Sequence, residues 1–396
     1  MPYRILGGIV LVYLDNAATT GQKPPTVRRA VADALINFSA NPGRSGHAFA
    51  QRAGEMVYKT REKTAKFFGA ETGEVIFTQN CTHSINMAIK GSLMRGDHVI
   101  ISSMEHNAVI RPIHTLKNNE IINYDIAQVI HGDDDATVRS FERLINEKTR
   151  MIICVHGSNV TGEILPIKRI GEICKKRNIT FVVDAAQTAG IIPIDCKESG
   201  IDFLCIAPHK GLYSPMGLGV LIARKPVLRT ITEGGTGSYS NLLVQPEDLP
   251  DRLESGTINL PGIAGLSAGI DFIKNTGIER IYKHETELCN MLADLLKKDS
   301  NFTLYGTIEK TGFFAPVVSF NLEGFTSMEV ADFLSKDGVA VRAGLHCSPL
   351  AHQSIGTLES GTVRVSPSFF NTKSDIYALS HALNSIKKRK NIRKNY

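Results

Sequence analysis

One cysteine stands between two histidines in the segment GLHCSPLAHQSIGT, residues 344–357. Its Gly, Ser and Pro content predicts a loop rather than a helix or a strand. Three chemistries are open to Cys347: a nucleophile on a movable loop, a zinc ligand together with His346 and His352, or a small buried apolar residue. Structural zinc needs four ligands and this loop offers three closely spaced ones, so we expect no metal here.

A second set of chemically versatile residues follows short apolar runs. They are Cys81-Thr82-His83 after VIFTQN, Glu105-His106-Asn107 after VIISS, Ser158-Asn159 after MIICVHG, Asp184 and Gln187 after FVV, and His209-Lys210 after FLCIA. If the runs are parallel strands, these residues lie at the carboxyl ends of the strands, where open α/β sheets bind their ligands.

These residue types suit a phosphorylated aromatic cofactor with a reactive carbonyl. Thr82 at a helix N-terminus can hold a phosphate. A buried Asp would pair with a protonated ring nitrogen, a His would stack on the ring, and a partly desolvated Lys would form a Schiff base. The combination describes pyridoxal phosphate (PLP), whose ring is an electron sink. Each residue alone also has an ordinary structural explanation, such as a helix cap or a solvated charge.

Alternating periodicities indicate the elements that position these residues. Apolar β-branched runs at 73–80, 97–103, 150–157, 180–186 and 201–207 predict strands, and amphipathic patterns at 53–69, 82–96, 108–118, 137–147 and 166–178 predict the helices between them. This order is typical of a mostly parallel α/β sheet flanked by helices. The run ILGGIVLVYL near the N-terminus is short for a membrane span, and we interpret it as one strand.

The change of pattern after about residue 260 predicts a second domain. We expect an N-terminal extension over 1–11, a large PLP-binding α/β domain over 12–260 whose segment of about 12–30 packs with the small domain, connecting helices over 261–298, a small α+β domain over 299–386, and a basic tail over 387–396. Helices are predicted over 327–336 and near 373–387. The chain's 396 residues can bury a substantial core.

Charge and cysteine content narrow the protein class. Six basic residues between Lys387 and Lys394 equal the whole formal net charge of +6, so we expect a solvated tail, with nucleic-acid binding as the weaker alternative. Seven cysteines without a CxxC pair predict free thiols and a cytoplasmic location.

Several ordered motifs resemble the class V aminotransferase group of fold-type I PLP enzymes, and within it the cysteine desulfurases and selenocysteine lyases. They are YLDNAATT, SNVTGEILPI, VDAAQTAG, PHKGLYSPMGLGVL, LESGTINLPGI and VRAGLHCSPLAH. The resemblance implies a large domain with a seven-stranded sheet and a homodimer with shared active sites. Three departures are Ala207 in place of a phosphate-binding Ser or Thr, a longer segment after Lys210, and Cys81-Thr82-His83 in place of a Thr-Thr or Thr-Glu pair.

The resemblance also implies roles by position. Lys210 would form the Schiff base, Asp184 would pair with the pyridine nitrogen, and His106 would stack on the ring. Asn159 and Gln187 would approach the phenolic oxygen, with Asn159 also near the substrate. Phosphate contacts would come from Thr82, His83 and His209, with Thr257 supplied by the other subunit. Arg364, and with it Arg342, would bind the substrate carboxylate.

The reaction implied is conversion of L-cysteine to L-alanine with sulfur transfer to Cys347 as a persulfide. The sulfur would pass to an acceptor or scaffold protein for iron–sulfur cluster assembly or another thio-cofactor. Neighbouring histidines or another cation would favour the reactive thiolate of Cys347. Alternatives are a selenocysteine lyase, another class V aminotransferase or lyase in which Cys347 is incidental, and a non-catalytic sulfur-handling or nucleic-acid-associated subunit.

Overall fold

The computed structural model describes residues 5–6, 9–42, 46–227, 229–306 and 313–393. Within this range the chain forms two compact units. The first comprises residues 1–22, 157–164 and 279–396, and the second comprises 23–156 and 165–278. Among the described residues no helix is both long and apolar enough to cross a bilayer.

The second unit is built on a seven-stranded sheet in the order β4-β10-β9-β8-β7-β5-β6. The strands are β4 (Val75–Thr78), β5 (Asp97–Ser102), β6 (Ile122–Ala127), β7 (Thr149–Val155), β8 (Thr180–Asp184), β9 (Phe203–Ile206) and β10 (Gly219–Ala223). Only β10 runs antiparallel to its two neighbours. Strands β4, β9 and β10 are buried at every position, as expected of a sheet covered on both faces. The predicted α/β fold is confirmed.

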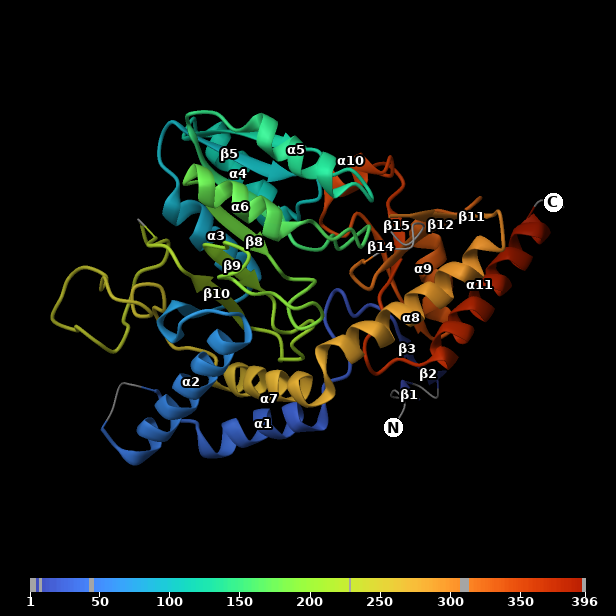
Figure 1. The fold of residues 1–396 in the computed structure, drawn as a ribbon. Coiled ribbons are helices and arrows are strands. Elements are labelled where there is room, and N and C mark those ends of the chain that lie inside the picture. The colour runs from blue at the N-terminus through green and yellow to red at the C-terminus, as the bar shows by residue number, and fades with distance from the viewer. Residues whose placement is uncertain (1–4, 7–8, 43–45, 228, 307–312, 394–396) are drawn as a thin grey trace. The chain divides into compact units, whose positions relative to one another are not determined.

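The helices of this unit are α1 (Pro25–Asn37), α2 (Ala48–Phe67), α3 (Cys81–Ser92), α4 (Asn107–Asn118), α5 (Asp134–Leu144), α6 (Ile167–Arg177) and α7 (Leu260–Thr276), with a short 3-10 turn, η1 (Thr72–Glu74). Helices α3 to α6 alternate with the strands, whereas α1 and α2 pack on α7 and lie beside it in Figure 1. The N-cap side chains of Asn80, His106 and Asp133 each accept a backbone N–H, which fixes where α3, α4 and α5 begin.

The first unit is an α+β structure around the sheet β11-β12-β15-β14. Its elements are β1 (Ile5–Leu6), β2 (Ile9–Val10), β3 (Val12–Tyr13), α8 (Ile278–Lys297), β11 (Phe302–Tyr305), β12 (Val318–Leu322), α9 (Ser327–Lys336), β13 (Val339–Ala340), β14 (Arg342–Gly344), α10 (Pro349–Ser354), β15 (Thr362–Val365) and α11 (Lys373–Arg393). Leu14, Leu292, Phe320, Val330 and Ile376 belong to its core.

Two local predictions are wrong. The run ILGGIVLVYL is not one strand, because β1 pairs antiparallel with β2 while β3 pairs in parallel with β13. The segment 344–357 contains a helix, α10, which begins at Pro349, a residue that is favourable in a first turn.

The basic tail falls largely outside the described residues, since residues 394–396 and the side chains of 388–393 lie beyond them. Its first residue, Lys387, belongs to α11 and forms an ion pair with Asp299. Hydrogen bonds from Lys387 and Asn301 lower the pKa of Asp299 to about 2.

Candidate active site

Asp184 ends strand β8 and is the centre of the polar group in the second unit. Its side chain is buried, with Oδ1 accepting the backbone N–H of Ala186 at 2.9 Å and the Cys81 thiol at 3.7 Å. The carboxylate therefore has a defined orientation before any ligand enters. The amino-acid sequence suggested this acid, but it did not suggest that a thiol would bond to it.

Cys81 brings together three features of this unit. It is the first residue of α3, and the charges of both Asp184 and Lys210 act on its thiol. Burial, reinforced by Asp184, raises the pKa of this thiol well above its usual value, so Cys81 is a neutral thiol rather than a nucleophilic thiolate. An amine, a carboxylate and a helix N-terminus thus occupy one neighbourhood.

His106 occupies the N-cap of α4, with Nδ1 accepting the N–H of Ala108 at 3.0 Å. Glu105 behind it is completely buried, and its Oε1 accepts Ser102 Oγ at 2.5 Å and Val155 N at 2.8 Å. Burial raises the pKa of Glu105 to about 8, so the acid is protonated at neutral pH. Glu105 therefore joins β5 to β7 directly beside His106. No role for it was predicted.

Lys23 is a second amine near the predicted Schiff-base lysine. Its Nζ donates to the carbonyl of His209 at 2.8 Å, and burial lowers its pKa to about 7. The pKa of His209 is lowered to about 4 by burial and by the charges of Lys210 and Lys23, so this imidazole is neutral. Sequence reasoning missed Lys23, which stands before two prolines in the segment GQKPP.

The remaining predicted cofactor residues of this unit occupy three places. Thr82 and His83 lie in the first turn of α3, where Asn80 Oδ1 caps the N–H of His83 at 2.9 Å. Burial lowers the pKa of His83. Gln187 is half-buried three residues after Asp184, and Thr257 is exposed.

Arg364 in β15 is a deeply buried cation of the first unit, with 1% of its side chain exposed. Its Nη2 forms an ion pair with Asp15 Oδ1 at 2.8 Å, and its Nη1 donates to the carbonyl of Asn159 at 3.1 Å. Nε is buried without a hydrogen-bond partner among the described residues. Burial lowers the pKa of this guanidinium while Asp15 opposes the shift.

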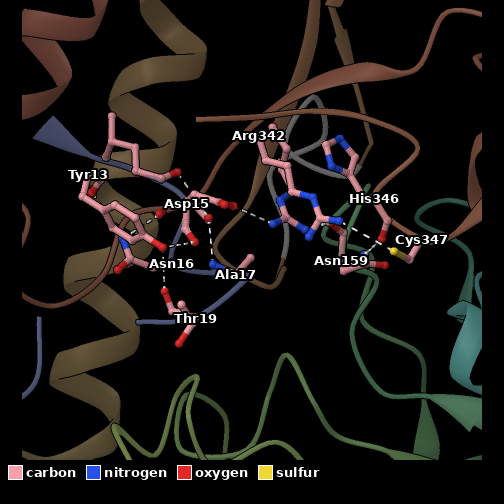
Figure 2. Close-up of polar contacts among 12 residues, drawn as sticks. Tyr13, Asp15, Asn16, Ala17, Thr19, Asn159, Arg342, His346 and Cys347 are labelled. Carbon is pink, nitrogen blue, oxygen red and sulfur yellow. Dashed lines mark hydrogen bonds and ion pairs between the residues drawn. The ribbon is translucent and has the colours of Figure 1, made fainter. Parts of the chain in front are cut away.

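The turn that carries Asp15 is hydrogen-bonded to Ser366, the residue that follows β15. Asn16 Nδ2 donates to the carbonyl of Ser366 at 2.9 Å, and Ala17 N donates to Ser366 Oγ at 2.8 Å. The hydroxyl of Tyr13 donates to the carbonyls of Asp15 and Thr19, as the dashed lines of Figure 2 show. These bonds place the Asp15 carboxylate next to a residue 349 positions away.

Arg342 is paired directly opposite Arg364 in the β14–β15 ladder. Its Nη2 lies 3.6 Å from Cys347 Sγ. Figure 2 shows Arg342, Asn159, His346 and Cys347 gathered in one place. Cys347 is exposed, whereas five of the other six free cysteines are buried and Cys81 is intermediate. The structure thus brings together four residues of this unit that were predicted separately or considered beside Cys347.

The two histidines beside Cys347 are not cations. His346 Nε2 lies 3.1 Å from both the carbonyl and the hydroxyl of Thr362, and His352 Nδ1 lies 2.7 Å from Thr357 Oγ1. Burial lowers the pKa of His346 to about 2 and that of His352 to about 4. The positive group at the sulfur is therefore Arg342. No cluster of three or more His, Cys, Asp or Glu suited to a metal occurs in the described part of the chain.

Comparisons with known proteins identify the family of this chain. The model of the aminotransferase class V family matches residues 12–379. The chain belongs to the class V aminotransferase family. The match spans the whole seven-stranded sheet of the second unit.

Individual relatives are similar over almost their full lengths. A probable cysteine desulfurase of Halalkalibacterium halodurans is 34% identical, with 96% of this chain and 94% of the relative covered. One of Methanothermobacter thermautotrophicus is 32% identical, with 95% and 94% covered. The solved apo cysteine desulfurase of Thermococcus onnurineus NA1 has a TM-score of 0.86 at 29% identity, covering 96% of this chain and 95% of that one.

Proposed function

We propose that this protein is a PLP-dependent cysteine desulfurase, which converts L-cysteine to L-alanine and accepts the sulfur on Cys347. The single observation that carries the proposal is that the exposed Cys347 thiol lies 3.6 Å from Arg342 Nη2. Arg342 belongs to β14, which pairs with β15, the strand that holds Arg364. The relatives named cysteine desulfurase support it independently.

The residues around Cys81 fit PLP, because an amine, a buried carboxylate and a helix N-terminus form the donor set that this cofactor needs. When bound, PLP supplies an electron sink for the substrate α-carbon. Lys210 would hold the cofactor and move protons at that carbon, Asp184 would pair with the ring nitrogen, and His106 would stack on the ring. Thr82, His83, His209, Gln187 and Asn159 complete the proposed contacts.

Arg364 would bind the substrate carboxylate. Because Nη2 is already paired with Asp15, the guanidinium is held in place before substrate arrives. Arg342 would lie beside the reacting sulfur. In the transfer, Cys347 Sγ attacks the substrate sulfur as a thiolate, and a sulfur–sulfur bond forms while the carbon–sulfur bond breaks. The electron pair left on carbon takes up a proton, giving alanine and the Cys347 persulfide.

The proposed oligomeric state, location and sulfur acceptor follow from the same function. We propose a homodimer in which Thr257 of one subunit completes the phosphate site of the other, and a cytoplasmic location, since all seven cysteines are free. The persulfide would pass to a sulfur-acceptor or scaffold protein in iron–sulfur cluster assembly or the synthesis of another thio-cofactor.

A product assay tests the proposal. The PLP-loaded protein is given L-cysteine, L-selenocysteine or cysteine sulfinate with a reductant, and alanine is measured with sulfide, selenide or sulfite. We expect alanine and sulfide from L-cysteine, loss of both in Cys347→Ala and Lys210→Ala, and retention in Cys174→Ala, a matched change at a buried cysteine of α6. Full desulfurase activity in Cys347→Ala would refute the role of this thiol. Product from selenocysteine alone would reassign the enzyme as a selenocysteine lyase.

A further inference from the structure

The backbone at Cys347 has an unusual conformation. His346 has a φ of 49° and Cys347 a φ of 60°, so two consecutive residues with side chains are left-handed. This region favours glycine and is unfavourable for other residues. Such a pair persists only where surrounding contacts hold it, and strained residues of this kind concentrate at functional sites.

Asn159 makes these contacts on both sides of Cys347. Its Nδ2 donates to the carbonyl of His346 at 2.8 Å, and its Oδ1 accepts the hydroxyl of Ser348 at 2.6 Å. The residues that flank Cys347, His346 and Ser348, are buried, and Asn159 is 6% exposed, so water competes little for these bonds. Figure 2 shows the amide of Asn159 directed at this segment.

The backbone around Asn159 is itself anchored. Ser158 N donates to the carbonyl of Glu163 at 2.8 Å, and the carbonyl of Val160 accepts Ser319 Oγ at 2.6 Å. The Asn159 carbonyl accepts Arg364 Nη1. One asparagine thus joins the segment of the exposed thiol to the buried arginine of β15.

We propose that Asn159 is a positioning residue whose side-chain amide clamps His346 and Ser348, and so holds Cys347 in its left-handed conformation with Sγ at Arg342. The inference takes the sulfur-accepting role of Cys347 from the proposed function. Its consequence is that Asn159 acts on the rate of sulfur transfer through the geometry of Cys347, in addition to any contact with cofactor or substrate.

Hydrogen exchange and alkylation test the clamp. In the PLP-loaded protein, amide exchange is followed by mass spectrometry for residues 345–349, together with the rate of iodoacetamide labelling of Cys347. Asn159→Ala removes both hydrogen bonds, and Asn159→Asp keeps the acceptor for Ser348 but places a carboxylate oxygen against the His346 carbonyl. Ser348→Ala removes one bond. Asn301→Ala is the control, because Asn301 Nδ2 also donates a side-chain amide hydrogen bond, to Asp299 Oδ1, in a remote turn of the same unit.

We expect the amides of segment 345–349 to exchange about tenfold faster for each hydrogen bond lost. Exchange should therefore be faster in Asn159→Asp and Asn159→Ala than in Ser348→Ala, and Asn301→Ala should exchange at the wild-type rate. Labelling of Cys347 should change in the same order. Rates of exchange and labelling equal to those of wild type in both Asn159→Ala and Ser348→Ala would overturn the clamp. Ser348→Ala keeps the test decisive if an Asn159 variant does not fold.

Steady-state kinetics separate positioning from general damage. With L-cysteine, Ser348→Ala should lower kcat and leave KM close to wild type, because the residue lies outside the proposed carboxylate site. A rise of KM in Ser348→Ala without a change of kcat would contradict the inference. A wild-type protein that forms no persulfide on Cys347 would refute the proposed function, whereas the exchange and labelling results would still decide whether Asn159 holds the segment.

Discussion

Replacing Arg364 with lysine tests how the substrate is recognised. Arg364 presents Nη1 and Nη2 to the Asn159 carbonyl and the Asp15 carboxylate, at 3.1 and 2.8 Å. A lysine keeps the charge but has a single ammonium group in place of the planar fork. In the proposed complex, Arg364→Lys therefore costs the substrate carboxylate one charge-assisted hydrogen bond.

The expected magnitude follows from that single bond. A hydrogen bond to a charged group contributes about 1.5–3 kcal/mol, so the affinity for L-cysteine should fall roughly 10- to 150-fold. Cysteamine is L-cysteine without its carboxylate, and it has no such bond to lose. The preference of the enzyme for L-cysteine over cysteamine should therefore fall by the same factor.

The assay is titration of the PLP-loaded protein with each compound, followed by visible absorbance. Arg224→Lys is the matched control, because Arg224 donates to the carbonyls of Cys196 and Ile201 in the second unit and has no proposed role in binding. We expect Arg224→Lys to bind both compounds as wild type does. Equal loss of affinity for both compounds in Arg364→Lys, or no loss for either, would refute the carboxylate role.

Three further changes test other parts of the structure. Folding raises the pKa of the Glu105 carboxyl from 4.5 to about 8, so this group stabilises the protein fully below pH 4.5 and loses that contribution as the pH rises to about 8. Glu105→Gln should therefore flatten the fall of Tm between pH 4.5 and about pH 8. A Tm profile identical to that of wild type would contradict the burial argument. Asn178 ends α6 with a φ of 54°, and Asn178→Gly should raise the free energy of unfolding by up to about 1 kcal/mol, measured by urea denaturation; destabilisation would contradict the strain argument. Arg342→Met should slow iodoacetamide labelling of Cys347 several-fold, because the cation at Sγ is lost; an unchanged rate would show that Arg342 does not activate the thiol.

The sequence predicted the α/β fold and five of the seven strands of its sheet, because strands buried on both faces are continuous apolar runs. Asp184, the last residue of β8, and Lys210, which follows β9, do lie in one neighbourhood around Cys81. Strands β6 and β10 were both missed. Strand β6 is a half-exposed edge strand that alternates in burial and lacks such a run, whereas β10 is buried at every position and was still not predicted. The role of each predicted site residue stays a prediction.

Other features of the site depend on contacts that no local pattern encodes. The pairing of Arg364 with Asp15 joins residues 349 positions apart. The left-handed pair His346 and Cys347 is held by Asn159, almost two hundred positions earlier in the chain, and neither residue is a glycine that would signal a positive φ. Burial, which makes His346 neutral, likewise comes from tertiary packing rather than from its place beside Cys347.

The most direct test of the central claim is mass spectrometry of the Cys347 peptide after one turnover. The PLP-loaded protein is mixed with one equivalent of L-cysteine without reductant, alanine is measured, and the peptide is compared with that of untreated protein. The account predicts one additional sulfur atom on Cys347 for each alanine formed. Alanine released in full while Cys347 carries no additional sulfur would contradict it.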